Sequence, residues 1–137
     1  MRDITIYRNL FTAGLDVDQL DLTPYVQPGR AGVDVDWLYT GAQTGPDGAE
    51  AYIARFAPGS HGNLHEHLGF ELMIVLDGEL HNDNGDVYPP GTLIVEQPTS
   101  VHQVSSPHGC VAIVIREKGT VPVSATAPAA VARAVGT

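Results

Sequence analysis

Short apolar runs that alternate with turns are the feature that most constrains how this chain can fold. Its 137 residues include 15 glycines and 10 prolines, and runs rich in valine and isoleucine lie between them. Such runs, recurring roughly every ten residues, are typical of β-sandwiches and β-barrels. Strands are predicted within residues 33–41, 51–59, 71–76, 86–98, 101–109 and 110–119. The fold class is therefore expected to be all-β, in a single domain.

The first two predicted strands flank a glycine-rich loop, so they are expected to pair as a hairpin. Upstream, residues 3–9 alternate like a short strand whose two isoleucines share one face. Residues 23–32 contain proline and glycine and are expected to form an extended crossing. No segment before the C-terminal tail has a helical period longer than a turn or two.

The charge and cysteine content exclude several functions. A net charge of −9 disfavours a nucleic-acid partner or an anionic membrane, because both select clustered lysine and arginine. No apolar run approaches the ~20 residues that span a bilayer, and the N-terminus lacks a secretory signal. The single cysteine excludes an internal disulfide framework. A cytoplasmic protein is the simplest expectation.

Two histidines and a glutamate form the most informative polar group. In an extended chain, residues i and i+2 point to the same face, so His65 and His67 lie together. A short loop allows Glu71 to return to that face. Imidazole and carboxylate groups are normal ligands of Fe, Mn, Ni or Zn. The alternative is that each histidine is an ordinary core residue, but another isolated histidine in a later strand, His102, favours a metal site.

The strand that begins at Glu71 is predicted to be buried on both faces. Met73 and Val75 share the face of Glu71 and are expected to line the site. The opposite face carries Leu72, Ile74 and Leu76. Because polar groups in such an interior are costly unless bonded or coordinated, the burial itself supports a metal site.

The remaining histidines and other reactive side chains have weaker claims. His61 is a candidate proton donor or additional ligand, although an exposed loop histidine is the simpler interpretation. His81 is expected on a solvated or rim face, and His108 in an exposed turn. Cys110 opens an apolar run and is expected to be a small buried hydrophobe. Core positions are predicted for the aromatic residues Trp37, Tyr52 and Phe56.

At these residues the sequence resembles the cupin family. The first cupin motif spaces a glycine, two histidines, a glutamate and a second glycine along the chain. Gly59, His65, His67, Glu71 and Gly78 meet it in full.

The second cupin motif is met in its spacing but only partly in its residues. Gly91 and His102 are retained. Gln97 replaces the motif proline, Thr99 the glycine and Ser106 the asparagine. These departures concern the turn before His102 more than the ligand itself.

The run from the first motif to the "YPPGT" turn is most similar to ChrR-type, RmlC-like cupins. The resemblance implies a double-stranded β-helix, which is a small jelly-roll barrel. It also implies one divalent transition metal, with Fe or Zn favoured over Ni or Mn. The ligands would be His65, His67, Glu71 and His102, with coordination positions left open for a small molecule.

The resemblance also divides the chain. Residues 1–33 are predicted to hold an N-terminal strand and a crossing segment, and residues 34–118 the metal-binding barrel. Residues 119–137 form an apolar tail that is expected to pack at the contact of a homodimer.

Three functions follow from the resemblance. The favoured one is a metal-dependent enzyme with dioxygenase-type cleavage of a small diketone-like or phenolic substrate. The second is a zinc-binding ChrR-type sensor or regulator. The first 34 residues contain no histidine or cysteine, so the separate zinc-binding region of ChrR-type anti-sigma proteins is not expected. The third is a non-redox isomerase, lyase or polyketide cyclase.

Overall fold

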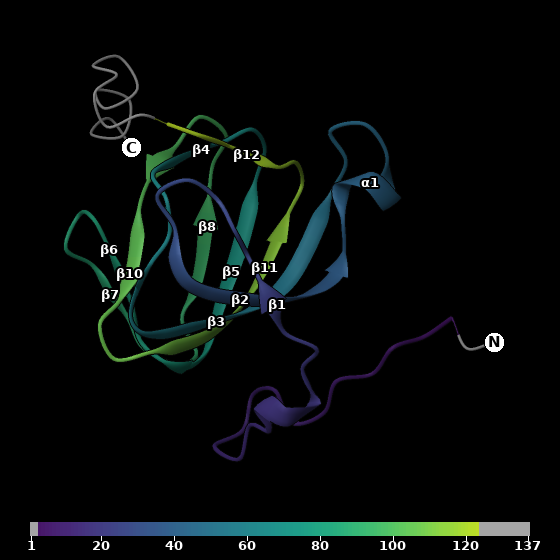
Figure 1. The fold of residues 1–137 in the computed structure, drawn as a ribbon, viewed down its shortest axis with the longest axis vertical. Coiled ribbons are helices and arrows are strands. Elements are labelled where there is room, and N and C mark those ends of the chain that lie inside the picture. Colours follow the sequence, from purple (N-terminus) through teal and green to yellow (C-terminus); the bar gives the residue numbers. More distant parts are fainter. Residues whose placement is uncertain (1–2, 124–137) are drawn as a thin grey trace.

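Strands dominate the computed structural model, which describes residues 3–123 (Figure 1). The strands are β1 (Thr23–Pro24), β2 (Ala31–Tyr39), β3 (Glu50–His61), β4 (His65–His67), β5 (Glu71–Gly78), β6 (Leu80–Asn82), β7 (Val87–Tyr88), β8 (Leu93–Glu96), β9 (Val101–His102), β10 (Val104–Ser106), β11 (Cys110–Arg116) and β12 (Thr120–Pro122). Within the described residues, helix is limited to a 3-10 turn, η1 (Val17–Gln19), and α1 (Gly41–Thr44), and neither could cross a membrane. The predicted all-β class is confirmed.

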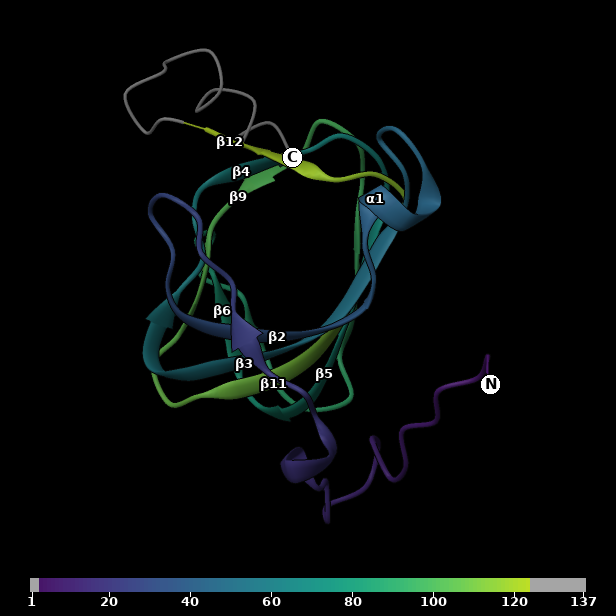
Figure 2. The ribbon, with the colours of Figure 1, turned by 45° about the vertical axis from the view of Figure 1, so that its right-hand side comes forward.

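Two antiparallel sheets curl around the interior. The larger sheet has nine strands; its order is β7-β6-β10-β3-β11-β5-β8, and β2 pairs with both β3 and β1. The smaller sheet has the order β12-β4-β9. Figure 2 shows the smaller sheet across the interior from β2, β3 and β11. β2 and β3 pair as the predicted hairpin, and α1 occupies the loop between them.

Alternating apolar residues on the inward face of the larger sheet build the main core. Val33 and Val35 of β2 are buried, and Val33 lies opposite Phe56 of β3. The predicted core aromatics belong here: Tyr52 and Phe56 are buried, and Trp37 is partly buried against the same cluster. The alternation of β2 therefore determines which of its faces turns inward.

The chain before β1 covers part of the outer face of the larger sheet. Leu20 is buried there with Ile53, Leu76, Val111 and Ile113. Tyr7, Leu10, Leu15, Val17 and Leu22 pack against this second cluster. The N-terminal segment thus supplies the apolar cover that the outer face of an isolated sheet would lack.

The strand predicted at residues 3–9 is not formed, so that prediction was wrong. Ile4 and Ile6 are 78% and 61% exposed instead of packing on one face. The segment crosses the outer face rather than pairing with an edge, and Tyr7 anchors it by donating a hydrogen bond to Asp36 over 2.8 Å. Side-chain contacts, and not a strand ladder, hold it in place.

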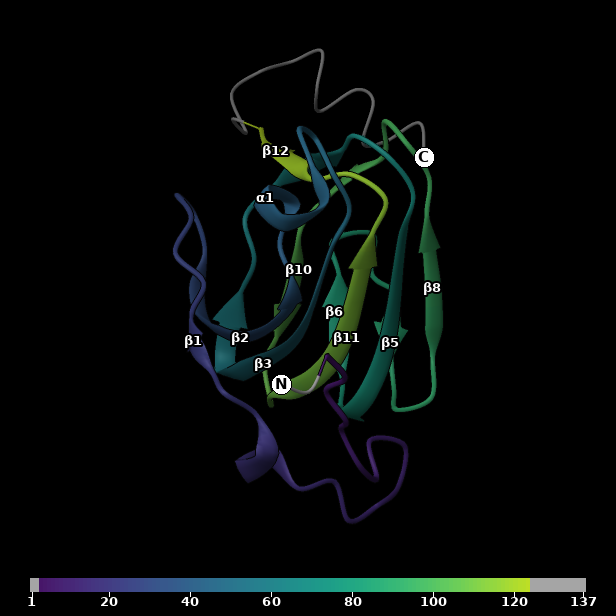
Figure 3. The same cartoon turned by 90° about the vertical axis from the view of Figure 1, so that its right-hand side faces the viewer.

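The prediction that β5 is buried on both faces was correct for only one of them. Glu71, Met73 and Val75 are buried on the inward face. On the outward face Leu76 is buried beneath the N-terminal segment, but Leu72 is 38% exposed. β8 forms an edge of the larger sheet next to β5, as Figure 3 shows. The apolar sequence of β5 did not reveal that the N-terminal segment covers only part of its outward face.

The barrel continues past residue 118. β12 pairs with β4, with Thr120 opposite His67 and Pro122 opposite His65. Most of the predicted tail, from residue 124 onward, lies outside the described residues, and its proposed dimer contact stays a prediction. Its first residues belong to the strand next to the histidines.

Candidate metal centre

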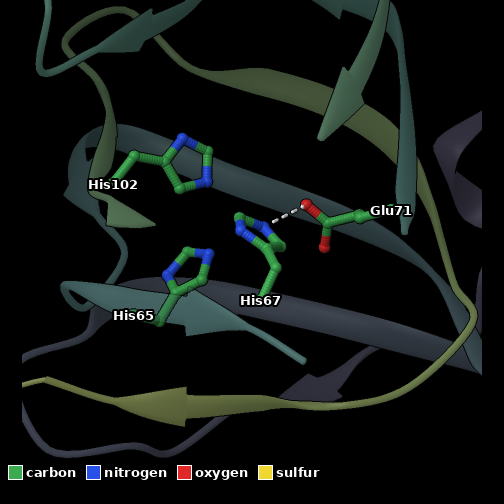
Figure 4. A group of neighbouring side chains, drawn as sticks. All are labelled: His65, His67, Glu71 and His102. Carbon is green, nitrogen blue, oxygen red and sulfur yellow. Dashed lines mark hydrogen bonds and ion pairs between the residues drawn. The ribbon is translucent and has the colours of Figure 1, made fainter. Parts of the chain in front are cut away.

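His65, His67, Glu71 and His102 converge inside the barrel (Figure 4). All four are buried, and one ligand atom from each lies within 4.8 Å of the others. β4 carries two of the histidines, β9 the third, and β5 begins with the glutamate. β4 and β9 pair with His65 opposite His102, so one short antiparallel pair places two ligands side by side. The structure therefore brings together all four residues of the predicted ligand set.

Backbone carbonyls orient the two histidines of β4. The Nδ1 of His65 lies 2.8 Å from the carbonyl oxygen of Asn63, and that of His67 lies 3.0 Å from the carbonyl oxygen of Ser100. A carbonyl only accepts hydrogen bonds, so Nδ1 carries the proton in both rings. The lone pair of neutral His65 is then on Nε2, the atom that faces the cluster, and His67 presents the same atom once it loses the Nε2 proton that it donates to Glu71. This is the usual arrangement of histidines that bind metals.

His102 is oriented by side chains instead. Its Nδ1 lies 2.9 Å from Oδ1 of Asn82 and 3.4 Å from Oε1 of Glu96. Burial raises the pKa of Glu96, and the charge of Glu71 adds to that effect. An acceptor at Nδ1 again leaves Nε2 with the lone pair, so all three imidazoles present the same atom.

Two of these nitrogens have no hydrogen-bond partner. Within residues 3–123, Nε2 of His65 and Nε2 of His102 are buried and unpaired. Burial lowers the pKa of His65 to about 3 and that of His102 to about 4, so both rings are neutral near pH 7. Buried polar atoms normally find partners, and a divalent cation would satisfy both lone pairs at once. The donor set thus fits a metal ion.

His67 and Glu71 contact each other directly. Nε2 of His67 lies 2.9 Å from Oε2 of Glu71. Burial alone would lower the pKa of His67, but the hydrogen bond and charge of Glu71 raise it. A metal ion and a proton would compete for this nitrogen and this oxygen, since ligands must be deprotonated to bind metal.

Arg116 is the functional residue that sequence reasoning missed. It is buried, and its Nε donates to Oε1 of Glu71 over 2.5 Å. Burial alone would raise the pKa of Glu71, but Arg116 and His67 hold it well below its usual range. The arginine thus keeps Glu71 ionised and occupies one carboxylate oxygen, which leaves Oε2 toward the histidines.

Arg116 belongs to a row of charged residues across four neighbouring strands. Glu50 of β3 lies opposite Arg116 of β11, Arg116 opposite Glu71 of β5, and Glu71 opposite Glu96 of β8. Carboxylates outnumber cations in this row, which favours a bound cation. The sequence carried one signal for this arginine. Side chains alternate in direction along a strand, so Arg116 shares the inward face of β11 with every second apolar residue of the run that starts at Cys110.

The turn before His102 is closed by hydrogen bonds although three of its residues differ from the motif. Thr99 stands at the motif glycine and adopts a φ of 74°, the left-handed region that β-branched residues rarely enter. Its backbone N–H donates to the carbonyl of His67 over 2.9 Å, and Ser100 Oγ donates to the carbonyl of Gln97 over 2.6 Å. The substituted turn therefore still holds Ser100 against the ring of His67.

The other predicted candidates lie elsewhere. His61 ends β3, is half-buried, and is not part of the four-residue cluster. Nε2 of His81 lies 2.9 Å from Oε1 of Glu79, and His108 is exposed. Cys110 is buried as expected, and burial raises the pKa of its thiol to about 12. None of these residues adds a ligand to the cluster.

Comparison with known proteins places the chain in one family. Residues 14–119 match the family described as the ChrR Cupin-like domain. No curated protein shows significant similarity in sequence.

Three solved structures illustrate the range of proteins that share this fold. An acetylacetone dioxygenase from Acinetobacter johnsonii is 13% identical with a TM-score of 0.69, over 91% of this chain and 79% of that one. The polyketide cyclase RemF from Streptomyces resistomycificus is 16% identical with a TM-score of 0.65, over 82% and 85%. The complex of SigE with the anti-sigma ChrR from Rhodobacter sphaeroides is 21% identical with a TM-score of 0.61, over 79% and 57%. At these identities they show the fold, the predicted cupin jelly roll, and not the activity.

Proposed function

Because the chain belongs to the ChrR cupin-like family, we propose that it is a metal-dependent cupin enzyme that acts on a small organic molecule. The ligands of its single divalent metal would be His65, His67, Glu71 and His102. The observation that carries the proposal is the convergence of three imidazole Nε2 atoms on one ionised carboxylate, two of these nitrogens being buried without a partner among residues 3–123. Such a set suits Fe, Zn, Ni or Mn, and we favour Fe or Zn.

The favoured reaction is dioxygenase-type cleavage of a diketone-like or phenolic substrate. The bound metal would supply Lewis acidity toward the substrate oxygens and open positions for the reactants. The similarity in fold to an acetylacetone dioxygenase supports this choice.

The protein's own residues would prepare the site before any reaction. The acceptors at Nδ1 of His65, His67 and His102 hold each ring in one tautomer. Arg116 keeps Glu71 charged within the interior. The apolar residues Met73 and Val75, on the same face as Glu71, limit water beside it and strengthen these charged interactions.

A sensor or regulatory role with tightly bound zinc is the second candidate. It is favoured by the family match and by the fold shared with the anti-sigma ChrR. A non-redox reaction is the third, and the fold shared with a polyketide cyclase supports it. The four ligands suit all three roles, so the identity of the metal and the use of oxygen must separate them.

Anaerobic purification with metal analysis, followed by iron loading, is the test of the enzyme proposal. The iron form is then mixed with diketones and catechol-like compounds while dissolved oxygen is recorded. We expect stoichiometric metal and substrate-dependent oxygen uptake. Tightly bound zinc without oxygen uptake would contradict the dioxygenase and favour the sensor or the non-redox enzyme.

A further inference from the structure

A small pocket lies beside the metal centre, and none of the four proposed metal ligands lines it. Its volume is about 180 Å³. The lining residues come from both sheets and from the connections around β1, β4 and β12: Tyr25, Gln27, Glu50, Asn63, Gly119, Thr120 and Pro122. A protein cavity of about 150 Å³ can hold one benzene molecule. The pocket therefore has room for one small ring, or for one end of a larger molecule.

One wall of the pocket is connected to the metal centre through Arg116. Its Nη1 donates to Oε1 of Glu50 over 3.0 Å, while its Nε donates to Oε1 of Glu71. The same Nη1 lies 3.4 Å from the hydroxyl of Tyr25. A single buried guanidinium thus contacts two pocket residues and one proposed ligand.

The other wall is connected through the histidine strand. Thr120 and Pro122 are the β12 partners of His67 and His65. The carbonyl of Asn63 accepts the hydrogen bond from Nδ1 of His65. Both walls therefore adjoin residues that orient the metal ligands, and a molecule in the pocket would lie next to that centre.

The wall between Tyr25 and Asn63 is held firmly in place by Arg30. Its guanidinium lies 4.0 Å from the centre of the Tyr25 ring and donates to Oδ1 of Asn63 over 2.9 Å. Tyr25 also packs against Trp37 and Tyr52, with ring centres 5.3 Å and 5.5 Å away. A wall ordered before binding reduces the entropy that a ligand must overcome.

The polar chemistry of the pocket selects the kind of ligand. Among the described residues that line it, Glu50 is the only charged one. Arg116 is already paired with two carboxylates, and Arg30 with Asn63 and an aromatic face. An anionic ligand would meet the carboxylate of Glu50, whereas a neutral ligand with a hydroxyl group could donate a hydrogen bond to it.

We propose that this pocket is a substrate subsite for the uncharged, hydroxyl-bearing end of the molecule that reacts at the metal. The inference rests on the proposed function and narrows its substrate class to neutral enols, phenols and catechols that carry a further hydroxyl group away from their metal-binding oxygens. Carboxylated analogues of the same ring are selected against by Glu50.

Calorimetric titration of the zinc-loaded protein tests the subsite without oxygen chemistry. The probes are 3,4-dihydroxybenzyl alcohol, which is neutral, and 3,4-dihydroxybenzoate, which is anionic; each leaves one group free for the pocket when its diol binds the metal. Glu50→Gln keeps an acceptor for Arg116 but removes the charge, so it should weaken the alcohol about fivefold and tighten 3,4-dihydroxybenzoate. Gln27→Ala should weaken the alcohol by a smaller factor. The metal content of both variants should match that of the native protein.

Glu79→Gln is the matched control, because Glu79 pairs with His81 and does not line the pocket. Failure of 3,4-dihydroxybenzyl alcohol to bind the native protein at millimolar concentration, or equal affinity in native and Glu50→Gln protein, would overturn the subsite. Oxygen uptake with a KM insensitive to Glu50→Gln would also overturn it while leaving the proposed function intact. Glu50-dependent binding without any oxygen uptake would instead contradict the dioxygenase and support the subsite.

Discussion

The two parts of the barrel interior are built by opposite means. One part is an apolar cluster in which Val35, Val75 and Leu80 are almost fully buried. The other part buries Glu71, Arg116 and three histidines, two of which have no hydrogen-bond partner at Nε2 in the part of the chain that the structure describes. The apolar part gains stability from burial itself, whereas each polar group depends on particular partners. The same barrel therefore combines a core that stabilises the fold with a site that is stable only as a network.

The largest expected effect is the loss of metal binding when a proposed ligand side chain in the polar part is removed. His65→Ala, His67→Ala or His102→Ala should each abolish stoichiometric metal, a loss of more than about 100-fold in affinity, because a missing ligand exceeds any effect of an outer partner. Elemental analysis after gel filtration measures it. His108→Ala, at an exposed histidine, is the control. Retention of full metal by all three ligand variants would show that the site is wrongly assigned.

Removing the buried cation should cost more stability than removing an apolar side chain. Arg116→Met leaves Glu71 buried without its counter-charge, so the free energy of unfolding should fall by about 3–5 kcal/mol. Added metal should restore part of the loss by neutralising Glu71. Urea unfolding of metal-free and metal-loaded protein measures both effects. The exposed Arg55 provides the matched control, Arg55→Met, and a loss in Arg116→Met no larger than in that variant would contradict the network.

A substitution in the apolar part should lower the free energy of unfolding without affecting metal binding. Leu80 is fully buried in the main cluster, so Leu80→Ala should lower the free energy of unfolding by about 3 kcal/mol. Metal affinity should change little. Leu93→Ala, at an exposed position on β8, should have almost no effect. A large drop in metal content of folded Leu80→Ala would show that the two parts are coupled more tightly than their contacts indicate.

Lowering the pH should reduce the stability of the metal-free protein through the histidines of the polar part. The pKa values of His65 and His102 fall to about 3 and about 4 in the folded protein, below the value of about 6.5 in an unfolded chain. The unfolded state therefore binds more protons, and stability should decline as pH falls from about 6.5 toward 4. The raised pKa of His67 acts in the opposite direction. Urea midpoints across this range should show a smaller decline in His65→Ala, and an equal decline would contradict the assignment.

The smallest expected effect concerns the turn that supports the polar part. Thr99 has a φ of 74°, so Thr99→Gly should relieve strain and stabilise the protein by about 1 kcal/mol. Thermal unfolding measures the change. Thr92→Gly is the control: Thr92 does not have a positive φ, so the change should be neutral or destabilising. Loss of stability in Thr99→Gly would mean that the turn is not strained.

Some strands could be predicted from the sequence and one could not, for a physical reason. The main strands from residue 33 to residue 116 are short apolar runs bounded by turns, so their positions were predicted well. The strand at residues 3–9 was not, because Ile4 and Ile6 have the right alternation but no neighbouring strand. Local pattern cannot show whether a pairing partner is available.

The site shows the same division. His65, His67 and Glu71 lie close together in sequence, and the motif spacing links them to His102. Arg116 is 45 residues from Glu71 along the chain, and Asn82 is 20 residues from His102. Their contacts depend on the register between strands that are distant in sequence. The sequence indicates which face of a strand a residue lies on, but it does not indicate which residue of another strand lies opposite.

By itself, the sequence determined the all-β class and the cupin motifs, and it singled out the four residues proposed as metal ligands, because periodicity and spacing are local properties of the chain. Only the tertiary structure decided which carboxylate oxygen of Glu71 faces the histidines, which cation balances Glu71, and where a pocket opens near these residues. Those features arise where the ends of β3, β5 and β11 lie in register and β12 pairs with β4. Sheet registry places Glu50, Arg116 and Glu71 in one row, and that row connects the pocket to the metal centre.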